Sequence, residues 1–320
     1  MSAIRALEIE VRPPWPYRLR RRNGGDGVTR VRGQVLTRLL HVAGAPVVVH
    51  AWQSDDGLVH LRAAGSDASS LAREQLELAL ERMRFALAVD DDLTEFYEAF
   101  RADPLVGPAV RRKPWYRPKR RPWPWEALAW AVTEQLIQSS RAAEIQRRMV
   151  RRWGAKLAPP ASPGSRSDVD AAWTGPGPLR DVPAANVVAG LAPAELAAMD
   201  LSTGRSIALV KCAREVAKGR ADLAEPGSDA RLLRIPEIGP WTVQCLGLGG
   251  RGDPDSLPAG DLAYVKLVGY LTGIGRRATV EEVEEYFAPY APFRALAGAF
   301  ALTHWGRGMG AGPPASSVAA

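Results

Sequence analysis

The segment 232–261 constrains the fold of this 320-residue chain more than any other segment. Its sequence is LLRIPEIGPWTVQCLGLGGRGDPDSLPAGD, and Pro240 follows the turn PEIG, at a first helical position where proline is favoured. The pattern predicts two helices joined by a tight turn, then a Gly-rich loop, then a helix that begins after Asp261. Gly239 lets a ligand approach the backbone closely, and free N–H groups at a helix start suit a phosphate. For the turn alone, an ordinary pair of packed helices is the alternative.

The charge balance favours a polyanionic partner. The chain has 42 Lys and Arg against 35 Asp and Glu, a formal net charge of +7, and a pI near 9.7. Its two cysteines, Cys212 and Cys245, argue against a disulfide framework and favour a reducing cytoplasm. The start MSAIRALEIE lacks the apolar core of a signal peptide, and the chain has no apolar run of about eighteen residues. We therefore expect a cytoplasmic protein without a membrane partner.

Residues 1–90 are predicted to form a small α+β domain. Alternation of apolar and polar residues predicts a half-buried strand at 6–11. Three further strand-like runs are separated by Gly- and Asp-bearing turns, at 28–35, 46–52 and 58–61. A helix over 71–88 is expected to cover the sheet with one apolar stripe, formed by Leu76, Leu80, Met83 and Leu87.

Residues 91–125 are predicted to be a helix followed by a basic linker. Over 111–121 the sequence RRKPWYRPKRR has seven cations and no acid, and its two prolines prevent a regular helix. The linker is either a solvated connector or an extended strand that touches DNA phosphates and makes binding salt dependent.

Residues 126–305 are predicted to be all-α, and the low-complexity residues 306–320 to be a disordered tail. Apolar residues at helical spacing predict a helix that begins near Trp125 and includes Leu136. Ser139 or Ser140 is expected to cap the next helix, over 141–153. By spacing alone Leu136 lies on the apolar face, where core packing is the simplest role.

Three segments together resemble the helix-hairpin-helix DNA glycosylases, and most of all the bacterial 3-methyladenine-DNA glycosylase II family. The segments are EALAWAVTEQLIQSSRAAEI, IGPWT and LPAGD. The resemblance covers about residues 90–305 well and the N-terminal domain loosely. It implies an α+β fold, with a small β-rich domain before an all-α domain whose two lobes flank the active site. It also implies a monomeric base-excision repair enzyme that flips alkylated bases of the 3-methyladenine and 7-methylguanine type out of damaged double-stranded DNA and excises them.

The resemblance also assigns roles to particular residues. Asp261 is the expected catalytic carboxylate, Trp241 and Gln135 line the base pocket, and Leu136 is the wedge that fills the hole left by the flipped nucleotide. The groups expected to bind DNA phosphates are those of Ile238, Gly239, Thr242, Ser139 and Ser140. The chain departs from the family at Glu237, where glycine is usual, and has leucine at two positions that are often aromatic, Leu262 and Leu302.

Elementary chemistry supports these roles beside simpler structural ones. A carboxylate near C1′ stabilises the positive charge that develops on the sugar as a base departs. Asp261 equally suits a helix N-cap. An electron-rich wall such as Trp241 favours a cationic alkylated purine, although the same ring can simply anchor the hairpin.

Position 241 also predicts the type of reaction. Related enzymes with lyase activity carry a lysine there that forms a Schiff base, which Trp241 cannot form. We therefore expect a monofunctional enzyme and disfavour a bifunctional glycosylase for oxidised bases. No cofactor or catalytic metal is expected from the scattered histidines His41, His50, His60 and His304, although the family's hairpin can hold a monovalent cation through backbone carbonyls.

A different class of function stays open beside the enzyme. A non-catalytic helix-hairpin-helix module grips the DNA backbone without sequence preference. Such a module needs neither Asp261 nor the pair Gln135 and Leu136, so these three residues distinguish the two classes.

Overall fold

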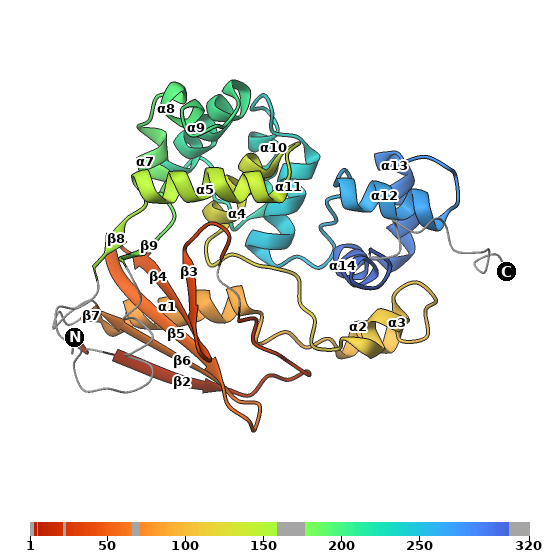
Figure 1. The fold of residues 1–320 in the computed structure, drawn as a ribbon, viewed down its shortest axis with the longest axis horizontal. Coiled ribbons are helices and arrows are strands. Elements are labelled where there is room, and N and C mark those ends of the chain that lie inside the picture. The colour runs from red at the N-terminus through yellow and green to blue at the C-terminus, as the bar shows by residue number, and fades with distance from the viewer. Residues whose placement is uncertain (1–2, 5, 22–23, 66–70, 159–176, 307–320) are drawn as a thin grey trace.

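The computed structural model describes residues 3–4, 6–21, 24–65, 71–158 and 177–306. Three packed units are visible in Figure 1: an antiparallel sheet with one covering helix, a lobe of helices above it, and a second group of helices beside both. We call them the sheet domain, the first lobe and the second lobe. The predicted α+β fold class is confirmed. Except for Gly306, the predicted tail over 306–320 lies outside the described residues.

The sheet domain is a five-stranded antiparallel sheet in the order β2-β6-β5-β4-β3. Its strands are β2 (Ala6–Val11), β3 (Thr29–Arg32), β4 (Val35–Val42), β5 (Ala45–Gln53) and β6 (Val59–Gly65), and a short pair is formed by β1 (Ala3–Ile4) and β7 (Leu71–Ala72). The helix α1 (Arg73–Leu87) covers one face and buries the predicted stripe residues Leu76, Leu80 and Met83. The predicted single strand over 28–35 is wrong, because Gly33 turns the chain at φ 55° and ends β3 before β4 begins.

The first lobe surrounds the buried side chains of Leu128, Trp130 and Ile145. Its elements are α4 (Pro124–Glu134), α5 (Ser139–Trp153), β8 (Lys156–Leu157), β9 (Leu179–Arg180), α7 (Ala185–Ala189), α8 (Pro193–Ala197), α9 (Thr203–Ala217), η1 (Pro226–Ser228), α10 (Asp229–Leu232), α11 (Pro240–Leu246) and η2 (Gly247–Arg251). The Gly-rich stretch after α11 is therefore helical rather than a loop. At Gly250 a side chain would crowd α4, since an added Cβ would lie 3.0 Å from the Ala127 side chain.

The second lobe packs around aromatic rings, among them the fully buried Phe96, Phe287 and Phe300. Its elements are α2 (Thr94–Phe100), α3 (Gly107–Arg112), α12 (Leu262–Leu271), α13 (Val280–Phe287), η3 (Ala288–Tyr290) and α14 (Arg294–Trp305). The helices α2 and α3 lie within the stretch predicted to be a helix and linker, and they pack into this lobe rather than connect two domains. A capping box joins Thr279 to Glu282 at the start of α13.

The basic segment 111–121 is held in part inside the protein. Its side chains bond to acids and carbonyls at the junction of the sheet domain with the lobes. The guanidinium of Arg121 donates to Asp26 at 2.7 Å and to Glu126 at 3.0 Å, and Arg117 is buried against the carbonyl of Asp91. The solvated-connector alternative is therefore wrong for Arg117 and Arg121, and contact of the segment with DNA phosphates stays a prediction.

Candidate active site

The predicted hairpin is formed by the C-terminus of α10, a turn over 233–239 and the N-terminus of α11. Gly239 is the N-cap of α11 with φ −107° and ψ 179°. A Cβ on Gly239 would meet no heavy atom within 4 Å, so the backbone there faces open space. Within the described residues, the N–H groups of Gly239 and Trp241 have no hydrogen-bond acceptor. This helix start therefore offers two free donors to an anion.

Ile238 and Thr242 contribute to the hairpin differently from the prediction. Their N–H groups already donate within the turn, to Ile235 O at 3.0 Å and to Gly239 O at 3.0 Å. The side chain of Ile238 is buried in the first lobe, and Thr242 is only 1% exposed. Both residues therefore shape the turn from inside, and the outward donors come from their neighbours.

Glu237 occupies the turn position where the resembling family usually has glycine. Its φ is 72°, a left-handed conformation that favours glycine and strains other residues by roughly 1–2 kcal/mol. The side chain folds back toward the start of α9: a Cβ added to Gly204 would lie 2.9 Å from Glu237 Oε1. A carboxylate beside a helix N-terminus is stabilised by the helix dipole. The sequence thus keeps the turn without glycine, and leaves a negatively charged residue in the turn that precedes the two free donors.

Asp261 lies between the two lobes, at the N-cap of α12. Its Oδ1 accepts from Ala263 N at 2.8 Å, and its backbone N–H donates to Pro258 O at 2.8 Å. The indole Nε1 of Trp241, on α11, lies 3.4 Å from Asp261 Oδ2, a long and weak hydrogen bond. Both residues are half-buried. The structure therefore brings the predicted carboxylate and the predicted aromatic wall into contact across the lobe boundary, and Asp261 is a cap as well.

Gln135 joins the end of α4 to the hairpin. Its Nε2 donates to Glu237 O at 2.7 Å and to the Thr242 hydroxyl at 2.8 Å. Its Oε1 is buried and has no partner among the described residues. An unpaired buried acceptor of this kind costs free energy unless a ligand or water supplies a donor. The amide nitrogen of Gln135 thus positions the turn, and its amide oxygen stays available to a donor from a ligand.

Leu136 follows directly and points into solvent. The helix α4 ends at Glu134, and Leu136 has φ 54° and a side chain that is 103% exposed. The core-packing alternative for Leu136 is therefore wrong. A fully exposed leucine held in a strained backbone conformation stabilises nothing in the free protein, so its apolar surface is available to an external partner.

Arg205 is a residue of this site that spacing and motifs did not indicate. Its guanidinium donates to Thr133 O at 3.2 Å and to Gln135 O at 3.0 Å, so it fixes the backbone on the N-terminal side of Leu136. Burial lowers the pKa of Arg205. Only the contact between α9 and the end of α4 reveals this role, and a lone arginine in a helix gives no sequence signal for it.

Ser139 and Ser140 lie in the first turn of α5 rather than before it. The helix begins at Ser139, its N-cap is Gln138, and no side chain caps it. Both serines are exposed. The predicted capping role is wrong, while both hydroxyls stay accessible three and four residues after Leu136.

Two more polar residues lie near the catalytic candidate. Burial raises the pKa of the Cys245 thiol well above its usual range, and the charges of Glu134 and Asp261 raise it further. Glu134 Oε1 accepts from Gln146 Nε2 at 3.0 Å. Cys245, one turn of α11 after Trp241, is therefore protonated and unreactive.

The two leucines at usually aromatic positions differ in exposure. Leu262, next to Asp261, is 49% exposed, whereas Leu302 is half-buried and packs on the second lobe. Trp305, one turn after Leu302, donates its indole N–H to Leu105 O at 3.0 Å and is anchored there. Trp305 therefore does not replace an aromatic wall, and Trp241 is the aromatic ring that contacts Asp261.

The fold is that of two DNA glycosylases of known structure. The 3-methyladenine DNA-glycosylase of Archaeoglobus fulgidus aligns with a TM-score of 0.70 and 18% identity, over 87% of this chain and 89% of that one. The 8-oxoguanine glycosylase/lyase of Clostridium acetobutylicum aligns with a TM-score of 0.66 and 13% identity, over 94% and 99%. At these identities the likeness concerns the fold.

Sequence comparison agrees with the resemblance seen in the motifs. The chain is 25% identical over 215 residues to the DNA-3-methyladenine glycosylase of Bacillus subtilis, covering 65% of this chain and 66% of that protein. It is 28% identical over 192 residues to a probable bifunctional transcriptional activator/DNA repair enzyme AlkA of Mycobacterium tuberculosis, covering 58% of this chain and 35% of that protein. The predicted resemblance is thus confirmed. The chain spans just under two thirds of the first relative's length and about a third of the second's. No protein-family model matches it.

In the described part of the chain, none of the helices has the length and apolar character needed to cross a membrane.

Proposed function

We propose that this protein is a monomeric, monofunctional DNA N-glycosylase that flips alkylated bases out of damaged duplex DNA and excises them with Asp261. One observation carries the proposal: a single chain of contacts links every part that such a reaction needs. The exposed wedge Leu136 adjoins Gln135, which bonds to the hairpin, and the hairpin's helix carries Trp241 against Asp261. The 3-methyladenine glycosylase named among its relatives supports this substrate class.

The site suggests a division of labour for the reaction. The N–H groups of Gly239 and Trp241 bind a phosphate of the DNA, and the exposed hydroxyls of Ser139 and Ser140 bind further phosphates. Leu136 fills the gap in the base stack, and the flipped base rests on the indole of Trp241, where a cationic purine gains a cation–π interaction. Gln135 Oε1 is the open acceptor on the adjacent wall. Asp261 then faces C1′ and stabilises the oxocarbenium ion while the base leaves with its bonding electrons and water attacks.

The absence of lyase chemistry is part of the proposal. A Schiff base needs an amine on the pocket wall, and the chain has Trp241 at that position. A monovalent cation at the hairpin is compatible with the chain, because the carbonyls of Ile235 and Glu237 each accept one hydrogen bond and keep a second lone pair.

A non-catalytic DNA-binding module is the second candidate, and the hairpin alone would serve it. Asp261 and Leu136 favour the enzyme, because a module that only grips phosphates gains nothing from an exposed leucine in a strained conformation. Duplex oligonucleotides with one 3-methyladenine, 7-methylguanine or 8-oxoguanine separate the candidates. We expect abasic sites from the alkylated bases, with strand breaks only after alkali. Breaks without alkali would indicate a lyase, and binding without base release would indicate the module.

Glu237 provides a prediction about affinity. Glu237→Gln removes the charge beside the hairpin donors and keeps the strained backbone, whereas Glu237→Gly removes both. We expect each variant to bind duplex DNA several-fold more tightly than wild type at low salt, since about one repulsive charge is lost. Fluorescence anisotropy at two salt concentrations measures this, and the difference should shrink at the higher one. Unchanged affinity in both variants would mean that the carboxylate beside Gly204 never faces DNA phosphate.

Arg205 provides a prediction about positioning. Arg205→Met leaves the carbonyls of Thr133 and Gln135 without their donor and should loosen the segment that carries Leu136. We expect excision from duplex DNA to slow by about tenfold, while excision from a lesion opposite a gap changes little. Arg214→Met is the matched control, because Arg214 lies on the same helix and bonds one carbonyl, that of Ala189. Equal losses on both substrates would assign Arg205 to general stability instead.

A further inference from the structure

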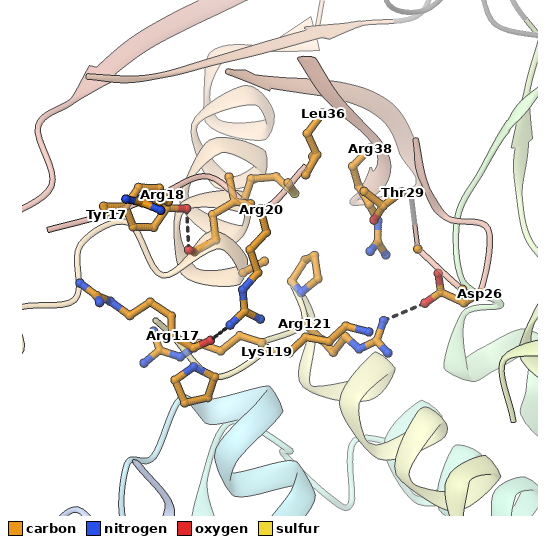
Figure 2. A pocket seen from close by; sticks show the side chains of 18 of the residues that line it. Tyr17, Arg18, Arg20, Asp26, Thr29, Leu36, Arg38, Arg117, Lys119 and Arg121 are labelled. Atoms are coloured by element: carbon orange, nitrogen blue, oxygen red, sulfur yellow. Dashed lines mark hydrogen bonds and ion pairs between the residues drawn. The ribbon is translucent and has the colours of Figure 1, made fainter. Parts of the chain in front are cut away.

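A second, cationic cavity lies between the sheet domain and the segment 115–122 (Figure 2). Its volume is about 320 Å³, and none of its lining residues belongs to the active site described above. The lining includes seven cationic side chains and one carboxylate, that of Asp26. The cations are Arg18, Arg20, Arg38, Arg117, Lys119, Arg120 and Arg121. Apolar side chains of β4 and α1, among them Leu36 and Met83, form another part of the wall.

Four of the seven cations are paired with carboxylates and hold the junction together. The pairs are Arg38 with Glu126 at 2.6 Å, Arg121 with Asp26 at 2.7 Å, Arg120 with Asp91 at 2.8 Å and Arg117 with Asp91 at 4.0 Å. These charges are largely neutralised inside the protein. These ion pairs give four of the seven cations a structural role at the junction. Ion pairing does not explain the other three cations.

Arg18, Arg20 and Lys119 have no carboxylate within ion-pair distance among the described residues. The guanidinium of Arg18 stacks on the ring of Trp115, 3.5 Å from its centroid, and Arg20 donates to the carbonyl of Arg117. In Figure 2 the guanidinium of Arg20 ends beside Arg117, and the Lys119 side chain extends along the cavity toward Arg121. Three unneutralised cations around one cavity repel one another, and an anion between them would remove that cost.

Lys119 is the member with the fewest contacts. Its side chain lines the cavity and is exposed to solvent, and no hydrogen bond from its ammonium is present in the described structure. Burial lowers the pKa of Lys119, and the charge of Arg121 lowers it further. With no protein partner, this ammonium is available for a charge-assisted hydrogen bond to an anionic ligand.

We propose that this cavity binds a phosphate-bearing small molecule of about mononucleotide size. The phosphate lies between Arg20 and Lys119, where charge-assisted hydrogen bonds hold it, and the apolar body rests against Leu36 and Met83. Sites for small molecules have volumes of roughly 300–1,000 Å³ and combine an apolar lining with a few placed polar groups.

A phosphate of bound DNA is the other source of the same chemistry, and it would have to differ from the phosphate at the hairpin. The hairpin donors lie at the start of α11, whereas the basic segment contacts the far end of the following helix, since Arg121 N donates to Gly249 O at 2.8 Å. Ten residues of helix between Gly239 and Gly249 span about 15 Å. A phosphate bound by the hairpin therefore cannot also enter the cavity, and a DNA phosphate there would belong to another nucleotide. The apolar wall of Leu36 and Met83 favours a soluble ligand with an apolar body, and duplex binding by variants of the cavity's cations distinguishes the two sources.

Isothermal titration calorimetry of the full chain with AMP, pyrophosphate and adenosine tests the proposal at constant ionic strength. We expect saturable binding of AMP and pyrophosphate and none of adenosine. Lys119→Met and Arg20→Met should each weaken AMP binding by at least roughly tenfold, while Lys218→Met, at an exposed lysine on the end of α9, should leave it unchanged. All three variants should keep the wild-type affinity for duplex DNA.

Three outcomes would overturn the proposal. The first is the absence of saturable AMP or pyrophosphate binding to wild type up to about 10 mM, the weak end of specific affinities. The second is AMP binding that Lys119→Met and Arg20→Met weaken no more than Lys218→Met does, which would place the ligand elsewhere. The third is a loss of duplex affinity in Lys119→Met and Arg20→Met without any small-molecule binding, which would assign the cations to DNA phosphate.

Discussion

Asp261→Asn should abolish most base excision while leaving folding and DNA binding intact. Asparagine caps a helix about as well as aspartate, so the bond from Ala263 N–H and the start of α12 should persist. The long contact with the Trp241 indole contributes little, and its loss costs little. What disappears is the negative charge that faces the developing oxocarbenium ion.

The size of the loss follows from that charge. Unit charges about 4 Å apart interact by about 4 kcal/mol at an effective dielectric constant of 20. Each 1.36 kcal/mol changes the rate about tenfold, so we expect single-turnover release of 3-methyladenine or 7-methylguanine to fall by about 10³-fold. Asp253→Asn, an exposed residue of the same loop, is the charge-matched control and should retain excision. Near-equal rates for wild type and Asp261→Asn would leave Asp261 as a helix cap only.

The site residues whose roles depend on local backbone could largely be predicted from the sequence. Asp261 opens α12 and Pro240 opens α11, as the helix-start signals of Asp and Pro predict. The helix α12 spans Leu262–Leu271 and begins directly after Asp261, as the sequence predicts. Local signals of this kind come from residues that are adjacent in the sequence, so they can be recognised without knowledge of the fold.

Properties that depend on distant partners could not be predicted. Arg121 pairs with Asp26, 95 residues away in the sequence, as well as with the nearby Glu126, and Arg120 pairs with Asp91, 29 residues away. A run of cations without nearby acids therefore looks free, although the fold places its partners inside the junction. The strand β4 could not be predicted from an alternation of apolar and polar residues. It is buried on both faces near the centre of the sheet, so its apolar residues do not alternate.

The exposure of Leu136 was hidden by an ambiguous helix end. Leu128, Val132 and Leu136 keep helical spacing, and neither Gly nor Pro marks a stop between them. Yet α4 ends at Glu134, because Gln135 turns aside with ψ 126° to bond the hairpin and Arg205 takes up the Thr133 carbonyl. Tertiary contacts, rather than helix propensity, therefore decide whether this leucine is core or surface.

Leu136→Ala should slow excision from duplex DNA by about thirtyfold without destabilising the protein. Removing a fully exposed side chain creates no cavity, so the melting temperature should stay within about a degree of wild type, in contrast to the several kcal/mol that a core Leu→Ala substitution costs. In the complex the leucine fills an unstacked step, and burying its side chain contributes about 2 kcal/mol. That energy corresponds to the thirtyfold change in rate.

Two comparisons isolate the wedge role. Excision of the same alkylated base opposite a gap needs no plug in the stack, so wild type and Leu136→Ala should release it at similar rates. Leu136→Met keeps an apolar side chain of similar volume and should restore most of the duplex activity. A loss that is equal on both substrates would place Leu136 in the chemical step rather than in the stack. A failure of methionine to rescue would show that the branched shape of leucine, and not its apolar volume alone, is what the stack requires.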